Sequence, residues 1–184
     1  MPPGQDVHVV PGFIDRGAVA VIRARYADAL QSGRIEPRGS MLTDTDAVPF
    51  LDAELIERVA AELRQAFPEL PELAVDYIAY TRAAEGGAHV LHADAVLEDG
   101  SPNHTAWRVA TAMLYLAESG SDFLGGAIHF DGPGRVIEPR AGLFVGFLTD
   151  WHHRHFVDTV TAGHRDALAF WFMDANKGRE VSSS

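Results

Sequence analysis

The residues in this chain best suited to chemistry lie in the segment His89-Val-Leu-His92-Ala-Asp94. In an extended strand, side chains two positions apart point to the same face, so His92 and Asp94 can present an imidazole and a carboxylate to one metal ion. A third donor must come from elsewhere in the fold. The cluster Trp151-His152-His153-Arg154-His155, which leads into a strand-like run, offers three histidines for that position.

Two histidines and one carboxylate form the ligand set of non-haem Fe(II) sites, which leave other coordination positions of the ion open. A His-x-Asp pair by itself also occurs on many protein surfaces, so a second feature is needed. Arg165 provides it. The run that contains Arg165 follows a turn at Ala162-Gly163 and can return alongside the strand that begins near His155.

Arg165 is expected to lie in the same cavity as the metal, deeper in the fold. Arginine binds a carboxylate with two parallel hydrogen bonds. A metal ion with open positions and an arginine behind it are together typical of a pocket for a dicarboxylic keto acid. The alternative for Arg165 is a surface ion pair with Asp166 or Asp158.

Five segments of the chain resemble, in order and in approximate spacing, the 2-oxoglutarate/Fe(II) dioxygenases of the prolyl-hydroxylase type. They are most similar to the leprecan (prolyl 3-hydroxylase) branch. The resemblance runs from about Leu73 to Asn176, over half of the chain. The segments are His89-Val-Leu-His92-Ala-Asp94, Thr111-Ala-Met-Leu-Tyr115-Leu, Phe123-Leu-Gly-Gly-Ala-Ile-His-Phe130, Pro139-Arg-Ala-Gly-Leu-Phe-Val-Gly-Phe147, and the run from His155 to Phe172.

The resemblance implies that His92, Asp94 and His155 bind Fe(II). It also implies that Arg165 binds the distal carboxylate of 2-oxoglutarate. His155 is preferred to the other two histidines of its cluster because its distance to Arg165 fits the family and because it begins the strand-like run. The carboxylate of Asp94 favours hydroxylation or desaturation over halogenation, since related halogenases lack it.

Further residues are expected to assist the cosubstrate or the substrate. His89 lies where the family often places a side chain that assists cosubstrate binding, but plain alternation turns it away from Asp94 unless the strand bulges. Tyr80 and Tyr115 are candidates for a hydrogen bond to the keto acid. The candidates for substrate binding at the mouth of the pocket are Arg82, Trp107, Arg108, Asp150 and Trp151.

By resemblance, the protein is expected to be a dioxygenase that uses Fe(II), 2-oxoglutarate and dioxygen to hydroxylate an unactivated C–H bond, releasing succinate and carbon dioxide. The expected substrate is an amino acid or a derivative of one, proline-like, and free, in a peptide or bound to a carrier. Loops 34–49, 97–106 and 150–154 are expected to select it. Two alternatives are a jelly-roll hydrolase or isomerase that holds zinc with the same ligands, and a non-catalytic binding module that a metal ion stabilises.

The composition excludes other kinds of site. The 184 residues contain no cysteine, which rules out disulfides and thiolate metal sites. The net charge of −11 argues against a nucleic-acid surface. No apolar run approaches the length of about 18 residues that indicates a membrane span. The start, Met-Pro-Pro-Gly-Gln-Asp, lacks the features of a signal peptide. Together with the absence of cysteine, this leads us to expect a cytoplasmic protein. The charge and the lack of a long apolar run lead us to expect no nucleic-acid or membrane partner.

The elements that position these residues follow from the periodicity of the sequence. Asp15 and Asp52 each precede a run whose apolar residues fall on one helical face. From Leu73 the chain changes to short strand-like runs separated by glycine and proline. The expected strands are 73–82, 88–96, 107–117, 127–130, 135–137, 143–148, 156–160 and 166–173, and the segment 34–49 is expected to be a loop.

Two helices followed by eight short strands predict a mostly β fold, a double-stranded β-helix (jelly roll) with the helices on one face. The length suits one domain with its own core, so residues 1–184 are expected to form a single domain. Its helical support would cover about 14–68 and its jelly-roll core about 73–176. The polar end from Lys177 to Ser184 is expected to be frayed.

Overall fold

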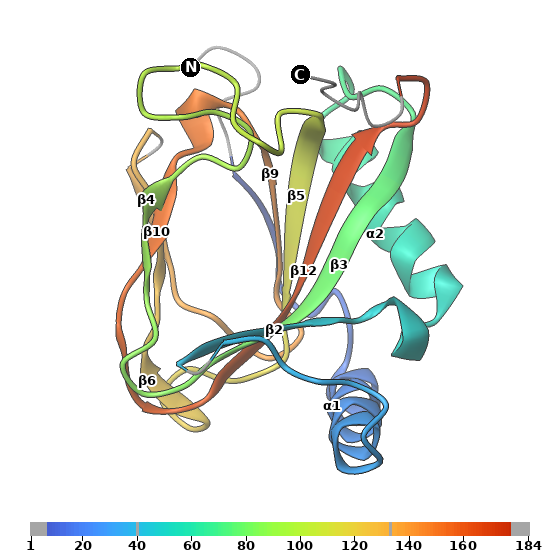
Figure 1. Cartoon of the computed structure of the whole chain (residues 1–184), viewed down its shortest axis with the longest axis vertical. Helices are drawn as coiled ribbons and strands as arrows, with labels where there is room; N and C mark the ends of the chain where they lie inside the picture. Colours follow the sequence, from blue (N-terminus) through green and yellow to red (C-terminus); the bar gives the residue numbers. More distant parts are fainter. Residues whose placement is uncertain (1–6, 40, 133, 178–184) are drawn as a thin grey trace.

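The computed structural model describes residues 7–39, 41–132 and 134–177. Within these residues two antiparallel sheets face each other, and both helices pack against the outer face of the larger sheet (Figure 1). The prediction of a mostly β jelly roll with two supporting N-terminal helices is confirmed. The first six residues and those from 178 onward, on which the expectations about a signal peptide and a frayed end rest, lie outside the described residues.

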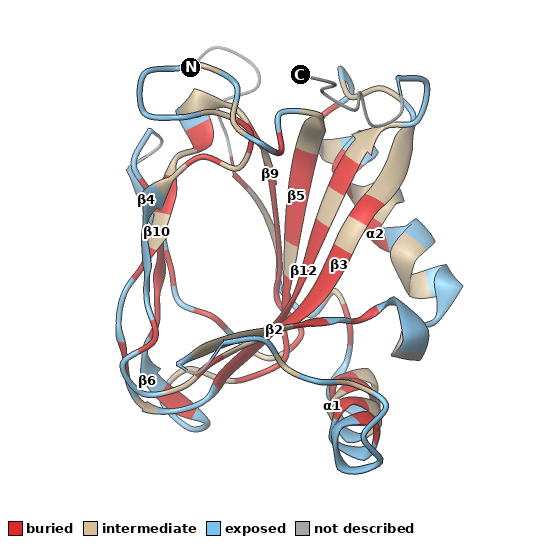
Figure 2. Cartoon of the chain, in the orientation of Figure 1, coloured by how far each residue is buried: buried red, intermediate tan, exposed pale blue. Residues whose placement is uncertain are grey.

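The larger sheet has the strand order β1-β9-β5-β12-β3-β2. Residues of its long central strands alternate between a face that packs against the helices and a face that points toward the smaller sheet. Figure 2 shows that these central strands are mostly buried or half-buried. The strands are β1 (His8–Val10), β2 (Leu42–Asp46), β3 (Leu73–Ala83), β5 (Arg108–Tyr115), β9 (Phe144–Leu148) and β12 (Arg165–Asp174).

The helices α1 (Arg16–Gln31) and α2 (Ala53–Ala66) begin directly after Asp15 and Asp52, but only Asp15 caps its helix with its side chain. The carboxylate of Asp52 instead accepts from Arg25. The carboxylate of Asp15 accepts the backbone N–H of Ala18 at 2.8 Å, which satisfies one of the free donors at the start of α1. The apolar stripes of the two helices bury against the outer face of β5 and β12. This core includes Ile22, Tyr26, Val59, Leu63, Leu114 and Phe170.

The smaller sheet has the order β4-β10-β7-β8, and β11 pairs with β6 beside it. A second core lies between the two sheets and contains Phe130, Phe147 and Val157. The strands are β4 (His89–His92), β6 (Phe123–Gly125), β7 (Ile128–Phe130), β8 (Arg135–Ile137), β10 (His155–Val157) and β11 (Val160–Gly163). Two short 3-10 helices, η1 (Val48–Phe50) and η2 (Trp151–His153), complete the elements.

The structure corrects the strand prediction in four places. The segment expected to be a loop contains the edge strand β2, whose sequence Leu-Thr-Asp-Thr-Asp pairs with β3. Polar residues suit this position because an edge strand has solvent on one side. The expected strand 88–96 ends at His92, and the expected strand 156–160 is divided into β10 and β11. The short strand β6 was not predicted.

Among the described residues, no helix has the length and apolar character needed to span a membrane.

Candidate metal centre

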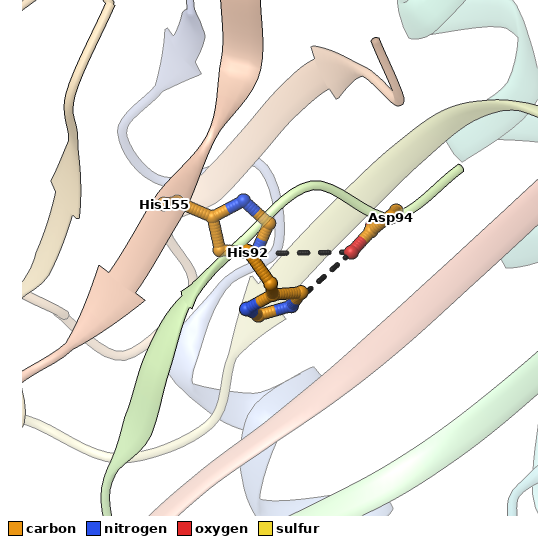
Figure 3. Close-up of side chains that lie close together, drawn as sticks. All are labelled: His92, Asp94 and His155. Carbon is orange, nitrogen blue, oxygen red and sulfur yellow. Dashed lines mark ion pairs between the residues drawn. The ribbon is translucent and has the colours of Figure 1, made fainter. Parts of the chain in front are cut away.

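Three side chains from two distant parts of the sequence, His92 and Asp94 from one and His155 from the other, meet between the sheets (Figure 3). The Nε2 atom of His92 lies 3.4 Å from Oδ1 of Asp94, and Nε2 of His155 lies 3.9 Å from the same oxygen. One donor atom of each residue lies within 4.8 Å of the donors of the other two. The structure thus brings together the three residues that the sequence suggested as ligands.

The backbone around these residues sets their positions. His92 ends β4 and is paired with His155 at the start of the neighbouring strand β10, which brings the two imidazole rings side by side, with their centroids 4.4 Å apart. Asp94 lies just beyond β4. Its carbonyl oxygen accepts the hydroxyl of Thr105 at 2.7 Å and the side-chain amide of Asn103 at 3.1 Å. The segment after β4 is thereby held against the 103–105 turn.

Hydrogen bonds on the far side of each imidazole fix which nitrogen carries the proton. Nδ1 of His92 lies 2.8 Å from the carbonyl oxygen of Val90, and Nδ1 of His155 lies 3.0 Å from that of His153. A carbonyl only accepts, so in both rings Nδ1 must be the donor. Both Nε2 atoms then direct a lone pair toward the centre, which is the orientation that metal-binding histidines need.

The second oxygen of Asp94 is occupied by the larger sheet. Oδ2 accepts the hydroxyl of Thr111 at 2.5 Å and the indole Nε1–H of Trp171 at 3.1 Å. These two donors leave Oδ1 to face the histidines. Neither Thr111 nor Trp171 was singled out in the sequence, although Trp171 has the same strand phase as Arg165 and could have been found by counting in steps of two.

The charge state of the centre fits a cation. Burial raises the pKa of Asp94, but the hydrogen bond with His92, the nearby His155 and the hydroxyl of Thr111 outweigh it, so the pKa lies well below its usual value. The Asp94 carboxylate raises the pKa of His92, whereas burial lowers that of His155. Once the proton that His92 shares with Asp94 is released, two Nε2 lone pairs and a carboxylate oxygen converge on one point, and a metal cation there would satisfy all three. This donor set matches a facial Fe(II) site.

Arg165 is buried, with an exposed fraction of 3%, and it lines the same cavity as the three ligands. Its Nε donates to the carbonyl oxygen of Gly126 at 3.0 Å, and its Nη2 donates to the hydroxyl of Tyr115 at 3.2 Å. Among the described residues, no carboxylate lies within ion-pair distance of it. The alternative of a surface ion pair with Asp166 or Asp158 is wrong.

Both of those aspartates are engaged elsewhere. Asp166 accepts Arg82 Nε at 2.7 Å on the opposite face of the sheet, and Asp158 lies 2.7 Å from the imidazole of His129. A buried guanidinium without a counter-charge is unfavourable, so the free N–H groups of Arg165 form a site prepared for an anion.

Two neighbours hold the Arg165 side chain in place. Gly126 has a φ of +67°, and a Cβ atom there would lie 2.9 Å from Cδ of Arg165. A glycine is therefore needed both for the backbone conformation and for space. Burial raises the pKa of Tyr115, which keeps its hydroxyl protonated. Because that hydroxyl oxygen accepts from Arg165, its hydrogen is available to donate to the same anion.

His89 reaches the cavity because β4 contains a bulge. His92 pairs with His155, and His89 pairs with Val157. The pairing therefore advances by three residues along β4 but by only two along β10, which leaves one extra residue on β4. The extra residue turns His89 to the same face as His92. Both line the cavity, which has a volume of about 340 Å³. His89 lies at the exposed rim of the cavity. Partial desolvation there, together with the neighbouring His92 and Arg165, lowers the pKa of His89 to about 4.

Of the other residues suggested from the sequence, only Arg108 also lines this cavity in the described part of the chain. Tyr80 and Arg82 lie in the opposite phase of β3 and contact Asp166 on the helix-facing side, so their expected roles in binding cosubstrate and substrate are wrong. The carboxylate of Asp150 caps η2 and lies 2.7 Å from His153.

Trp107 and Trp151 also lie outside the lining of the cavity. The indole Nε1 of Trp107 is buried without a partner among the described residues. Trp151 stacks with Arg154, whose guanidinium carbon lies 4.3 Å from its ring centre, and lines a neighbouring groove that also contains His92. Trp151 therefore lies near the centre without facing it.

The sequence matches the model of the 2OG-Fe(II) oxygenase superfamily over residues 77–173, more than half of the chain. Prolyl 3-hydroxylase 1 from Gallus gallus is 35% identical over 88 residues, which cover 45% of this chain and 12% of that protein. The chain thus corresponds to a small part of the length of this relative.

Solved structures share the fold over most of the chain. A viral collagen prolyl hydroxylase from Paramecium Bursaria Chlorella virus-1, in complex with 2OG, is similar with a TM-score of 0.68 at 18% identity, covering 91% of this chain and 94% of its own. A prolyl hydroxylase from Trichoplax adhaerens, in complex with a peptide fragment, has a TM-score of 0.70 at 16% identity and covers 98% and 88%. At such identities these likenesses establish the jelly-roll fold.

Proposed function

The chain belongs to the 2OG-Fe(II) oxygenase superfamily, and from this premise we propose that it hydroxylates an unactivated C–H bond of an amino acid or an amino-acid-derived substrate. The cosubstrates are 2-oxoglutarate and dioxygen, and the products besides the alcohol are succinate and carbon dioxide. A proline-like substrate is supported by the relative named prolyl 3-hydroxylase, which matches less than half of this chain.

We assign His92, Asp94 and His155 as the ligands of Fe(II). When bound, the iron and dioxygen supply the oxidising power that converts C–H to C–OH while 2-oxoglutarate is oxidatively decarboxylated. The protein fixes the two Nε2 lone pairs through the carbonyls behind the rings and presents Oδ1 of Asp94 through its contacts with Thr111 and Trp171. The alternative of a jelly-roll hydrolase or isomerase that holds zinc with the same three ligands is not supported by a comparable observation.

Arg165 is assigned to the distal carboxylate of 2-oxoglutarate. The observation that carries the proposal is that this buried guanidinium has no counter-charge among the described residues and shares a cavity with the metal centre. Ala167 and Ala169 lie in the same strand phase between Arg165 and Trp171, so small side chains line the floor along which the diacid would extend. The hydroxyl of Tyr115 can donate a second hydrogen bond to the same carboxylate.

The walls of the cavity include apolar side chains from both sheets. Ile128, Phe147 and Val157 are buried beside His155, and they limit the access of water to the centre. A dry pocket strengthens the interactions of Arg165 and of the ligands with charged groups, and it protects a reactive centre from side reactions. His89 faces this pocket as a neutral imidazole at neutral pH and is a candidate to contact the cosubstrate.

The test is succinate formation from 2-oxoglutarate with Fe(II) and dioxygen, with free proline, peptidyl proline and carrier-bound amino acids offered as substrates. Stimulated succinate release with a hydroxylated product supports the proposal. Asp94→Ala and His155→Ala should abolish turnover, and Arg165→Ala should mainly raise the 2-oxoglutarate concentration needed. Unchanged turnover in all three variants would contradict the assignment. The cytoplasmic location and the absence of nucleic-acid and membrane partners stay predictions.

A further inference from the structure

One wall of the cavity carries a carboxylate that the metal centre does not use. Asp44 lies on β2, the edge strand of the larger sheet, and lines the cavity together with Leu42 from the same strand. His89 and His92 line it from β4, the edge strand of the smaller sheet. The cavity is therefore bordered by the edge strands of both sheets, and Asp44 belongs to the border opposite the histidines.

Asp44 has no cationic partner. Among the described residues, its carboxylate receives one side-chain hydrogen bond, from the hydroxyl of Tyr77 at 3.4 Å, and no Lys, Arg or His nitrogen lies within 4.0 Å of it. Arg108, also in the lining, is already neutralised, because its Nε donates to the buried Asp76 at 2.8 Å. Arg38 pairs with Asp44 across a β-bridge without forming an ion pair with it. Apart from the ligands and Arg165, Asp44 is thus the charged group of the lining that has no ion pair among the described residues.

Aromatic rings connect this carboxylate with the metal centre. Tyr77 stacks with Trp171 at a centroid distance of 5.9 Å and an interplanar angle of 10°. Trp171 in turn donates its indole N–H to Asp94 at 3.1 Å. The Trp171 ring is already covered, because Tyr77 stacks on it and the guanidinium carbon of Arg108 lies 4.6 Å from its centroid. The ring that can meet an organic ammonium group beside Asp44 is therefore that of Tyr77, and together they offer an ion pair and cation–π attraction.

We propose that Asp44 and Tyr77 form a subsite for a protonated amine of the substrate, next to Trp171. This inference rests on the proposed function and narrows its substrate class. An amine that stays protonated neutralises Asp44, whereas an amide nitrogen carries no charge and leaves the carboxylate uncompensated. Of the free, peptidyl and carrier-bound forms, the site therefore selects substrates that keep a cationic nitrogen.

The experiment measures binding to the protein loaded with Fe(II) and 2-oxoglutarate under nitrogen, where no turnover occurs. The probes are L-proline and L-lysine, each compared with its fully N-acetylated counterpart. Calorimetry gives the dissociation constants, and the NMR signal of the Trp171 indole N–H, assigned by its loss in Trp171→Phe, reports the location. We expect at least one free amine to bind about tenfold or more tightly than its acetylated counterpart and to shift the Trp171 signal.

Variants of β2 separate a local contact from a general charge effect. Asp44→Asn should weaken binding of the amine about tenfold without weakening that of the acetylated probe, and Asp44→Glu should restore most of the loss. Asp46→Asn is the matched control, because it removes the same charge from the same strand at an exposed position outside the lining. The control should change the amine affinity less than twofold.

Three results would overturn the inference: no binding by either amine, equal binding of the acetylated probes, or equal losses in Asp44→Asn and Asp46→Asn. Failure of the proposed function has a different signature. A wild-type protein that binds 2-oxoglutarate and forms succinate but shows no preference for amines contradicts only the amine subsite. A protein that does not bind 2-oxoglutarate contradicts the function itself.

Discussion

The Asp94 carboxylate illustrates how single residues prepare this centre. One oxygen faces His92 and His155, and the other is held by Thr111 and by the indole of Trp171. These outer contacts restrict the carboxylate to one orientation, so the free oxygen does not have to be ordered when a metal binds. Contacts of this kind raise metal affinity without touching the ion.

Removing the indole donor should therefore weaken metal binding. Trp171→Phe keeps an aromatic ring but leaves Oδ2 of Asp94 with Thr111 as its remaining donor among the described residues. We expect the affinity for Mn(II), measured by calorimetry, to fall about tenfold. Trp107→Phe is the control, because the Trp107 indole N–H has no partner among the described residues and lies outside the cavity lining. Equal affinities in both variants would show that the indole contact does not support the ligand.

The pKa of His89 gives a pH-dependent prediction for the metal-free protein. Its folded-state pKa is about 4, while the ordinary value is about 6.5. Between these two pH values the unfolded chain takes up a proton that the folded protein does not, so stability is lost as the pH falls through this window. His89→Gln removes this loss. The unfolding free energy of the wild type minus that of the variant should fall between pH 7 and pH 5 in urea titrations; a constant difference would contradict the shift.

At the scale of the elements, the sequence predicted the helices and most strands but not which face each strand presents to the site. Side chains alternate along β12, so Arg165 and Trp171 point to the same face of the sheet. This could be predicted from the sequence once Arg165 was assigned to the cavity. In β3 both faces carry aromatic residues, Tyr77 toward the cavity and Tyr80 toward α1, so the face that points to the cavity cannot be identified from the sequence pattern. The wrong assignment of Tyr80 follows from that ambiguity.

Two further features depend on contacts between distant strands. β2 is polar, and it becomes a strand because β3 offers an unpaired edge, which local sequence does not reveal. The bulge in β4 that turns His89 inward is visible only in the register with β10, although the need for a bulge could be stated in advance. By contrast, the three ligands and Arg165 were suggested by residue type and spacing together with the resemblance to the prolyl-hydroxylase type of dioxygenase, and the fold brings them to one cavity.

The turn before β7 gives a prediction at the element scale. Gly126 and Gly120 both have positive φ angles, but an added Cβ meets close atoms, including Arg165, only at Gly126 of the two. Gly120→Ala should lower the unfolding free energy by about 1 kcal/mol from backbone strain. Gly126→Ala should cost at least ~1 kcal/mol more, since Arg165 and its neighbours must also move.

The same pair of variants separates stability from function. Gly126→Ala should weaken 2-oxoglutarate binding by displacing the guanidinium, whereas Gly120→Ala should leave it unchanged. Chemical denaturation and calorimetry are the two measurements. If both variants bind 2-oxoglutarate like the wild type, the position of Arg165 does not depend on Gly126.

At the scale of the whole molecule, the two faces of the larger sheet have separate roles. The outer face packs against both helices, and the inner face supplies Thr111, Trp171 and Arg165 to the cavity. The smaller sheet supplies His92 and His155. The centre therefore joins the two sheets, and a metal ion bound there links them.

Metal binding should accordingly stabilise the entire fold rather than one sheet. At a free Mn(II) concentration one hundred times the dissociation constant, the unfolding free energy should rise by about 2.7 kcal/mol. Thermal unfolding should remain a single transition, as expected for one domain. Asp94→Ala should remove the increase. Two separate transitions, of which only one shifts with metal, would contradict a centre shared by both sheets.

The most direct test of the central claim compares 2-oxoglutarate with 2-oxobutyrate, a keto acid that lacks the distal carboxylate. Calorimetry measures the binding of each keto acid to the Mn(II)-loaded wild type and to Mn(II)-loaded Arg165→Gln, which gives four dissociation constants. We predict that the wild type binds 2-oxoglutarate about tenfold to a hundredfold more tightly than 2-oxobutyrate, and that Arg165→Gln removes this preference while its 2-oxobutyrate affinity stays near that of the wild type. An equal preference in both proteins, or binding that does not depend on the metal, would contradict the assignment of this cavity.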